Sequence, residues 1–413
     1  MGEAGRGLPS PPPWGVKETW GGPTFSHEPV PGWRPAGSPK IICSKKRQRR
    51  RCPPSARTLP AAPMSNPADL TLSAPLTGLA GGLRLGRHLL PNRVFAAPMA
   101  GVTDRPYRRL ARQLGAGYCV SEMVTSRADL RDTLKTSRRA NHDGEAAPIA
   151  VQIVGTDPEQ IAEATRYNLE RGADIIDINM GCPAKKVCNR WAGSALMQDE
   201  DLAARLVEAA VAAARPFGAP VTLKMRAGWC EAARNAPRIA RRAEAAGAAM
   251  LVVHGRTREQ GYGGEAEYAT LAEVKRSVGI PVVANGDIDS PQKAAAVLRQ
   301  SGADAVMIGR AAMGRPWLFG QVAAYLERGV LLPGPAPVQW RDWLFAHLDD
   351  HYALYGEAIG VRTARKHVGW YVAALPEGET FRRQFNTLGS AAEQLAALRG
   401  FLDSGSRAAP LAA

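Results

Sequence analysis

Eight short runs rich in apolar and β-branched residues recur between residues 85 and 330, and helical patterns separate them. Strands that alternate with helices over about 230 residues predict a (β/α)8 TIM barrel in the α/β class. The expected strands are Val94–Met99, Tyr118–Met123, Ile149–Val154, Ile175–Asn179, Val221–Met225, Met250–His254, Pro281–Asn285 and Ala305–Ile308. The expected helices include Pro158–Arg171, Asp201–Ala214, Ala236–Ala246 and Pro291–Ser301. Asp157 and Ser290 are predicted to cap the first and the last of these, each directly before a proline at the first helical position.

A doubly wound sheet is the alternative arrangement of alternating strands and helices. Its dinucleotide fingerprint, G-x-G-x-x-G directly after the first strand, does not occur after Val94–Met99. The barrel is therefore the favoured fold.

The alternation stops after Trp317, and Leu331–Pro335 is typical of a linker. Helical patterns then continue at Trp340–Tyr355, Ala358–Leu375, Glu379–Leu388 and Ala391–Leu402. We therefore expect three parts, which are a disordered Pro/Gly-rich basic leader at residues 1–75, a catalytic barrel at 85–330 and a small all-helical domain at 336–405.

The leader carries much of the net charge of +15, because residues 1–63 hold eleven Lys or Arg against three acids. Its basic run Lys45–Arg51 is compatible with a nucleic-acid-binding arm or a nuclear signal. The plainer alternatives are a solvated tail, or an upstream extension of the reading frame with the working start near Met64. We favour the plainer alternatives.

Composition narrows the class of protein. With 45% hydrophobic and 22% charged residues the chain is typical of a globular protein, and no apolar run approaches the ~18 residues that a membrane span needs. The six cysteines show no paired metal spacing, so we expect reduced thiols, no metal and a cytoplasmic location.

Functional groups of a (β/α)8 barrel lie at the C-terminal ends of the strands, and six of the eight predicted strands end in polar or charged residues. Cys182 follows one of them, in a loop that Pro183 restricts. Its thiol is either presented to a ligand or a small buried hydrophobe, which is the common fate of a free cysteine. Lys224 is compatible with the Schiff base of an aldolase, with a charge partner for a reduced flavin, or with a structural ion pair.

The last two strands predict a phosphate site. Asn285-Gly286-Asp287 and Gly309-Arg310 follow the seventh and eighth strands, where barrels commonly bind phosphate. Backbone N–H groups together with Arg310 would hold a dianion. His254 ends the sixth strand beside Gly255, and this position favours a functional role over a core role.

Together these motifs resemble the tRNA-dihydrouridine synthases. The resemblance is carried by Ala97–Asp104, Val151–Ile153, Asp177–Pro183, Leu223–Arg226, His254–Thr257 and Asn285–Asp287. Met180, Ala184–Val187, Ala192–Leu196 and Arg365–Val368 resemble the bacterial DusB branch. The resemblance covers about Leu85 to Leu402, and it departs from the family at Cys188–Trp191, where Asn-Arg-Lys-Leu is more usual.

The resemblance implies an FMN enzyme that uses NADPH (or NADH) to reduce the C5=C6 bond of a D-loop uridine in tRNA, nominally at position 17. Cys182 would be the general acid, and the enzyme would act as a monomer. The implied FMN-binding residues are Pro98, Met99, Ala100, Gln152, Lys224, His254, Asn285, Gly286, Asp287, Gly309 and Arg310. The implied substrate-binding residues are Asn179, Arg226, Arg362, Arg365 and Lys366.

Three alternatives remain at this point. The first is an FMN barrel dehydrogenase that acts on a free small molecule such as dihydroorotate, and the Cys-Pro-Ala-Lys-Lys loop and the basic helical domain argue against it. The second is an aldolase that uses Lys224. The third is a non-catalytic tRNA-binding protein, which the intact set of Cys182, Lys224, His254 and Arg310 disfavours.

Overall fold

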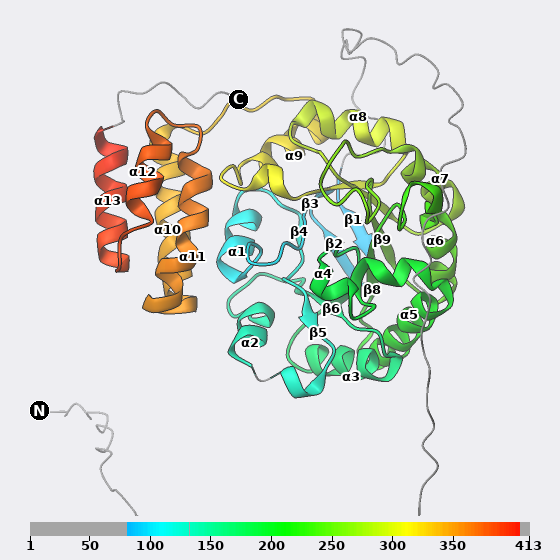
Figure 1. Ribbon diagram of the computed structural model, residues 1–413. Helices are drawn as coiled ribbons and strands as arrows, with labels where there is room; N and C mark the ends of the chain where they lie inside the picture. Colours follow the sequence, from blue (N-terminus) through cyan, green and yellow to red (C-terminus); the bar gives the residue numbers. More distant parts are fainter. Residues whose placement is uncertain (1–80, 132, 405–413) are drawn as a thin grey trace, which may run out of the picture. The chain divides into compact units, whose positions relative to one another are not determined.

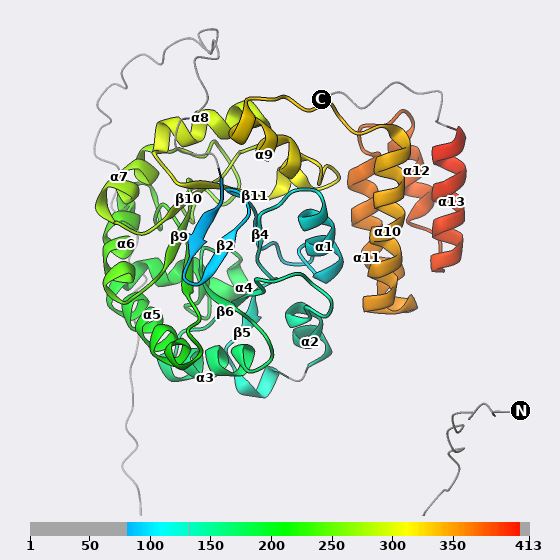
Figure 2. The ribbon, with the colours of Figure 1, turned by 180° about the vertical axis from the view of Figure 1, so that it is seen from behind.

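The computed structural model describes residues 81–131 and 133–404, so the predicted leader lies outside the described part of the chain. Nine parallel strands form one sheet in the order β4-β3-β11-β10-β9-β8-β7-β6-β5, and helices surround the strands (Figures 1 and 2). The strands are β3 (Val94–Ala96), β4 (Tyr118–Cys119), β5 (Val124–Thr125), β6 (Ala150–Val154), β7 (Ile175–Met180), β8 (Val221–Arg226), β9 (Met250–His254), β10 (Val282–Asn285) and β11 (Ala305–Ile308).

The sheet closes into a barrel through the segment that follows β4. Val120 forms a parallel bridge with Ala150 of β6, and the N–H of Ser121 donates to the carbonyl of Ala150 at 3.0 Å. The predicted (β/α)8 fold class is therefore confirmed, with each of the eight predicted runs overlapping a strand.

The second predicted run, Tyr118–Met123, is a strand only in its first two residues, which form β4, and β5 begins directly after the run. Between them the Ser121 hydroxyl accepts from the N–H of Gln152 at 3.0 Å, which takes the place of a backbone ladder bond. The next side chain, Glu122, turns away and accepts from the N–H of Gly101. Side-chain hydrogen bonds thus interrupt the strand where an apolar pattern predicted continuity.

An antiparallel hairpin precedes the barrel and was not predicted. It consists of β1 (Leu83–Leu85) and β2 (His88–Leu90). Leu83, Leu85 and Leu90 are buried in the same cluster as inward-facing side chains such as Phe95. The three leucines therefore extend the core inside the barrel.

The barrel helices begin where the caps predicted. Asp157 accepts from the N–H of Gln160 and Ser290 from that of Lys293, with proline in the first turn of both helices. The helices are α1 (Arg105–Gln113), α2 (Leu134–Ala140), α3 (Pro158–Leu169), α4 (Lys185–Cys188), α5 (Glu200–Ala214), α6 (Ala236–Ala245), α7 (Ala269–Ser277), α8 (Pro291–Ser301) and α9 (Leu318–Arg328).

Four helices form the C-terminal helical region. They are α10 (Pro337–Tyr355), α11 (Glu357–Val372), α12 (Gly378–Phe385) and α13 (Ala391–Ser404). Their core includes Leu344, Val368, Phe385 and Leu398. The third and fourth expected helices differ from α12 and α13 only at their ends. None of the helices between residues 81 and 404, residue 132 aside, has the length and apolarity of a membrane span.

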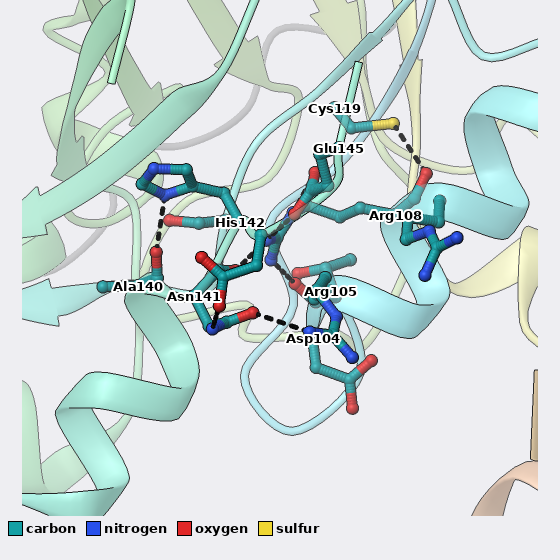
Figure 3. Close-up of polar contacts among 12 residues, drawn as sticks. Asp104, Arg105, Arg108, Cys119, Ala140, Asn141, His142 and Glu145 are labelled. Atoms are coloured by element: carbon teal, nitrogen blue, oxygen red, sulfur yellow. Dashed lines mark hydrogen bonds and ion pairs between the residues drawn. The ribbon is translucent and has the colours of Figure 1, made fainter. Parts of the chain in front are cut away.

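Helix α1 joins this region to the barrel, and both belong to one compact unit. Arg105 and Arg109 of α1 each form an ion pair with Asp350 of α10, at 2.7 and 2.9 Å. On its other side α1 is tied to the segment after α2, because Arg108 pairs with Glu145 and donates to the carbonyl of Asn141 at 2.6 Å (Figure 3). The start of α1 is therefore fixed from both sides.

Candidate active site

A cavity of about 950 Å³ lies at the C-terminal ends of the barrel strands. The predicted catalytic, cofactor and uridine residues come together there, since side chains from β6 to β11 and from the segment after β3 line its wall. The predicted residues that line it are Pro98, Met99, Ala100, Gln152, Asn179, Cys182, Lys224, Arg226, His254, Asn285, Gly286, Asp287, Gly309 and Arg310.

The three predicted tRNA contacts on α11 are not part of this cavity lining. Arg362 is exposed and its Nε donates to the carbonyl of Ala358 at 3.1 Å. Arg365 is half-buried and reaches the carbonyl of Leu388 at 3.3 Å. Lys366 is also half-buried, and its Nζ lies near Gly101 of the barrel.

The loop that carries Cys182 is held by Asn179 at the end of β7. The side-chain oxygen of Asn179 accepts from the N–H of Gly181 at 3.2 Å and from that of Cys182 at 3.0 Å. Its amide nitrogen donates to Oε1 of Gln152 at 2.7 Å. This is the Asx type of turn, in which a side chain replaces a backbone acceptor.

A second set of contacts, from the segment 188–194, fixes the carbonyl of Cys182. It accepts from the hydroxyl of Ser194 at 2.9 Å and from the thiol of Cys188 at 3.5 Å. Gly193, at φ 62°, passes so close that a Cβ would lie 2.9 Å from the same oxygen. Cys188 is buried there, so the second thiol of the loop supports the first and does not line the cavity.

The thiol of Cys182 is partly exposed to the cavity. Burial raises its pKa above the ordinary value, and a hydrogen bond from the N–H of Ala184 offsets this only in part. Cys182 therefore carries its proton at neutral pH, as a proton donor must.

A buried polar network underlies the loop. Gln152 donates to Oδ2 of Asp177 at 2.6 Å, and Thr222 donates to Oδ1 at 2.5 Å. Burial raises the pKa of Asp177, while these two hydrogen bonds and the charge of Lys224 oppose the shift. The sequence analysis missed Asp177 as a support of Gln152. Positions 177 and 179 are two residues apart on one strand, so their side chains point to the same side of the sheet.

Lys224 lines the cavity, and its side chain is half-buried. Its ammonium donates to Oδ1 of Asn285 at 2.9 Å, and Nδ2 of Asn285 donates to the carbonyl of Met307 at 2.8 Å. Burial lowers the pKa of Lys224 to about 8; Arg226 acts in the same direction and Asp177 opposes it. A desolvated cation with a lowered pKa favours a negative charge on any ligand placed against it.

Loops after β9, β10 and β11 build the cationic side of the cavity. Asp287, at φ 47°, receives both ends of the Arg256 guanidinium at 2.7 Å. Arg310 lies 3.6 Å from the same carboxylate and keeps 49% of its side chain exposed. Arg256 was not among the predicted site residues. Because Arg256 occupies both carboxylate oxygens of Asp287, Arg310 is the cation that is more available to a ligand.

Two further features shape this side. Gly286 has φ 123°, and a Cβ there would lie 2.7 Å from Cβ of Ala266 and 2.9 Å from the ring of His254, so only glycine fits. Burial lowers the pKa of His254 well below its usual value, and the charges of Lys224 and Arg226 add to the shift. His254 is therefore a neutral imidazole that can donate one hydrogen bond and accept another.

Arg226 was predicted to contact the substrate, and its guanidinium connects two loops. Nε donates to the carbonyl of Gly181 at 2.8 Å, and Nη1 donates to the carbonyls of Thr257 and Gly261 at 2.8 Å each. The nearby Tyr262, 58% exposed, was missed by the sequence analysis. Arg310 lies over its ring, 4.6 Å from the centroid.

Fold and site together define a (β/α)8-barrel enzyme with a protonated thiol, a desolvated lysine and a cationic anion site in one cavity. The model of the Dihydrouridine synthase (Dus) family matches residues 95–405. The tRNA-dihydrouridine synthase B of Xanthomonas campestris pv. campestris is 56% identical over 322 residues, which are 78% of this chain and 96% of that protein. The tRNA-dihydrouridine synthase B of Pseudomonas aeruginosa is 54% identical over 319 residues, 77% of this chain and 95% of that protein.

The chain therefore belongs to the dihydrouridine synthase family, and these relatives support the B branch. The family and the enzyme class predicted from the sequence are confirmed.

Proposed function

We propose that the protein reduces the C5=C6 bond of a D-loop uridine in tRNA to 5,6-dihydrouridine, acting as a cytoplasmic monomer. The single observation that carries the proposal is the position of Cys182, a protonated thiol held at the rim of a cavity that Lys224 also lines. The family match and the tRNA-dihydrouridine synthase B relatives support the same reaction.

The cofactor that fits the cavity is FMN. Gly286 and Gly309 leave backbone uncovered where a phosphate would approach, and Arg310 supplies an available cation beside them. Lys224 would face the ring system, and Pro98, Met99, Ala100, Gln152, His254, Asn285 and Asp287 would complete the shell. When bound, FMN would accept a hydride from NADPH or NADH and pass it to C6 of the uracil.

Residues of the chain would supply the remaining chemistry. The Cys182 thiol would hold the proton that C5 of the uracil receives. Asn179 lines the same cavity, and its amide nitrogen has one hydrogen left after donating to Gln152, so it would meet the uracil beside Cys182.

The substrate would enter as a uridine flipped out of the tRNA fold, because the reacting bond must lie beside Cys182 and the flavin within the cavity. Lys185 and Arg258 line the rim of that cavity. Arg362, Arg365 and Lys366 on α11 would contact tRNA phosphates, which position a nucleic acid without reading its sequence.

A direct assay tests the proposal. The purified protein, supplied with flavin and NADPH, is incubated with unmodified tRNA, and nucleosides are then analysed by mass spectrometry. Dihydrouridine at a single D-loop position is expected, with position 17 as the first candidate. Turnover of dihydroorotate in place of tRNA would replace the proposal with the small-molecule alternative.

A further inference from the structure

Three histidines of the helical region gather against the start of α1. They are His347 and His351 on α10 and His367 on α11, and we call them the histidine cluster. Each offers one ring nitrogen, and these nitrogens all lie within 4.8 Å of one another. The cluster is closed to solvent, since the three side chains are only 3%, 0% and 1% exposed.

Asp104, the N-cap of α1, completes the cluster from the barrel side. It is fully buried, and its Oδ1 accepts from the N–H of Tyr107 at 3.1 Å. Its other oxygen, Oδ2, lies 3.4 Å from Nδ1 of His351. The cluster therefore brings three imidazoles and one carboxylate together from three different helices.

Many of the polar atoms in this group lack a hydrogen-bond partner among the residues that the structure describes. They are both ring nitrogens of His347, Nδ1 of His351, Nε2 of His367 and Oδ2 of Asp104. Buried polar atoms are nearly always satisfied, and each unsatisfied one costs about 1–3 kcal/mol. Both nitrogens of one ring cannot face the same ion, so at most four of the five atoms, one from each residue, can share a ligand. Their presence in one buried cluster indicates a site for a cation.

The contacts of Thr363 favour one tautomer of His351. The Thr363 hydroxyl lies 2.8 Å from the carbonyl of Ile359, to which it can donate its single hydrogen. With its hydrogen used there, the hydroxyl accepts from Nε2 of His351, which also lies 2.8 Å away. In the neutral ring Nδ1 then carries a lone pair, and that lone pair faces the carboxylate of Asp104. Two acceptors at 3.4 Å repel one another unless a cation lies between them.

We propose that His347, His351, His367 and Asp104 bind one divalent transition metal ion, with zinc the expected occupant. Three imidazole nitrogens and a carboxylate oxygen are a four-ligand set that zinc accepts, and closure to solvent is typical of a structural site. Ligand atoms of a tetrahedral zinc lie about 3.4 Å apart, so the most separated of the cluster nitrogens would move together on binding. The Thr363 contact to His351 then acts as the usual outer-shell support of a metal-bound histidine.

Such an ion would join the helical region to the active-site face of the barrel. Asp104 is two residues from Val102, which lines the catalytic cavity, as do Pro98, Met99 and Ala100 earlier in the same segment. A metal there would set the position of α11 relative to the cavity rim. The inference does not depend on the proposed reaction, because it concerns ligand chemistry alone.

The sequence analysis expected no metal because it considered only cysteine spacing. His347 and His351 are four positions apart, so both lie on one face of α10. His367 and Asp104 come from other elements, and no local spacing shows that they meet.

The test is metal analysis of the full chain, purified without a histidine tag. The protein is incubated with zinc, passed over a chelating resin and analysed by elemental mass spectrometry. About one equivalent of zinc per chain is expected to remain. Cobalt in place of zinc should give the visible absorption of tetrahedral coordination, and zinc should raise the Tm of the protein by a few degrees.

Variants assign the ion to the cluster. Asp104→Asn keeps a good N-cap and should weaken zinc affinity by ~10-fold or more in a chelator competition; His367→Ala should lose the ion. His142→Ala and Cys182→Ala are the matched controls and should both retain one equivalent, because neither residue belongs to the cluster. Should the His367 variant fail to fold, Asp104→Asn decides the matter. Retention of no zinc by the wild type, or equal zinc affinities of the wild type and Asp104→Asn in the chelator competition, overturns the proposal.

Discussion

The side-chain oxygen of Asn179 accepts a hydrogen bond from the backbone N–H of Cys182 at 3.0 Å. The end of strand β7 thereby sets the position of the reactive thiol three residues further along the chain. The same amide is fixed by Gln152, which Asp177 fixes in turn. The thiol is therefore placed by a buried chain of side chains rather than by the loop backbone alone.

Replacing Asn179 with alanine should misplace the thiol without removing it. We expect reoxidation of the reduced flavin by tRNA to slow by a factor on the order of 10–10², because small errors in placement have effects of this size. Asn179→Asp keeps the oxygen that accepts from Gly181 and Cys182, and it should retain more activity than Asn179→Ala. Stopped-flow absorbance of the flavin measures both. Equal defects in the two variants would mean that the turn at Asn179 does not place Cys182.

Cys182→Ala should separate the two halves of the reaction. Reduction of the flavin by NADPH needs no proton from the thiol, so its rate should be close to that of the wild type. Reoxidation by tRNA should fall by a factor on the order of 10²–10⁴, as for the loss of a general acid.

Cys188→Ala is the matched control for that experiment. The Cys188 thiol is buried and contacts the carbonyl of Cys182 at 3.5 Å, away from the cavity. Its loss should lower stability slightly and leave reoxidation nearly unchanged. A larger defect in Cys188→Ala than in Cys182→Ala would mean that Cys188, and not Cys182, is the acid.

Lys224→Met should weaken flavin retention and abolish tRNA reduction while the barrel stays folded. The lysine titrates at about 8 in the folded protein against 10.5 for the free side chain. Because the folded pKa is the lower one, the desolvated charge destabilises the native state below about pH 8, and this penalty disappears as the pH rises toward 10.5.

The stability difference between wild type and Lys224→Met should therefore depend on pH. As the pH rises from 8 toward 10.5, it should shift in favour of the wild type by up to ~3 kcal/mol. Urea unfolding of the flavin-free proteins at several pH values measures the shift. A difference that stays constant with pH would show that Lys224 is not held in a desolvated position.

Much of the fold was predictable because its determinants are local. Alternating apolar runs and the caps Asp157 and Ser290 are visible in short windows of sequence, and strands and helices appear where they predict. The break in the second strand was not predictable, because it depends on a hydrogen bond between Ser121 and Gln152, which are far apart in the chain. The resemblance to a known family supplied the residues of the cavity, which periodicity alone could not.

Interactions between distant elements explain what the sequence analysis missed. Arg256 receives its role from Asp287, and Asp177 receives its role from Gln152 and Thr222, each through tertiary hydrogen bonds. The histidine cluster depends on α10 and α11 packing against the start of α1. No pattern within one segment indicates these interactions.

The tRNA-binding role proposed for α11 can be tested separately from the chemistry. Arg362 is exposed and Arg365 and Lys366 are half-buried, and burial lowers the pKa of Lys366 while Asp104 and Glu122 oppose the shift. Replacing all three with glutamine should weaken tRNA binding and reduce its salt dependence, by a slope of roughly 0.7–0.9 for each phosphate that the variant no longer neutralises.

Reduction of the flavin by NADPH should be unchanged in this triple variant, because none of the three side chains lines the catalytic cavity. Arg276→Gln, a change in a basic residue of α7 on the barrel, is the control and should leave both measurements as they are. Fluorescence titrations with tRNA at several salt concentrations give the slopes. A parallel fall in flavin reduction and tRNA binding would mean that α11 shapes the catalytic cavity itself, and that tRNA binding and flavin chemistry are not divided between the helical region and the barrel.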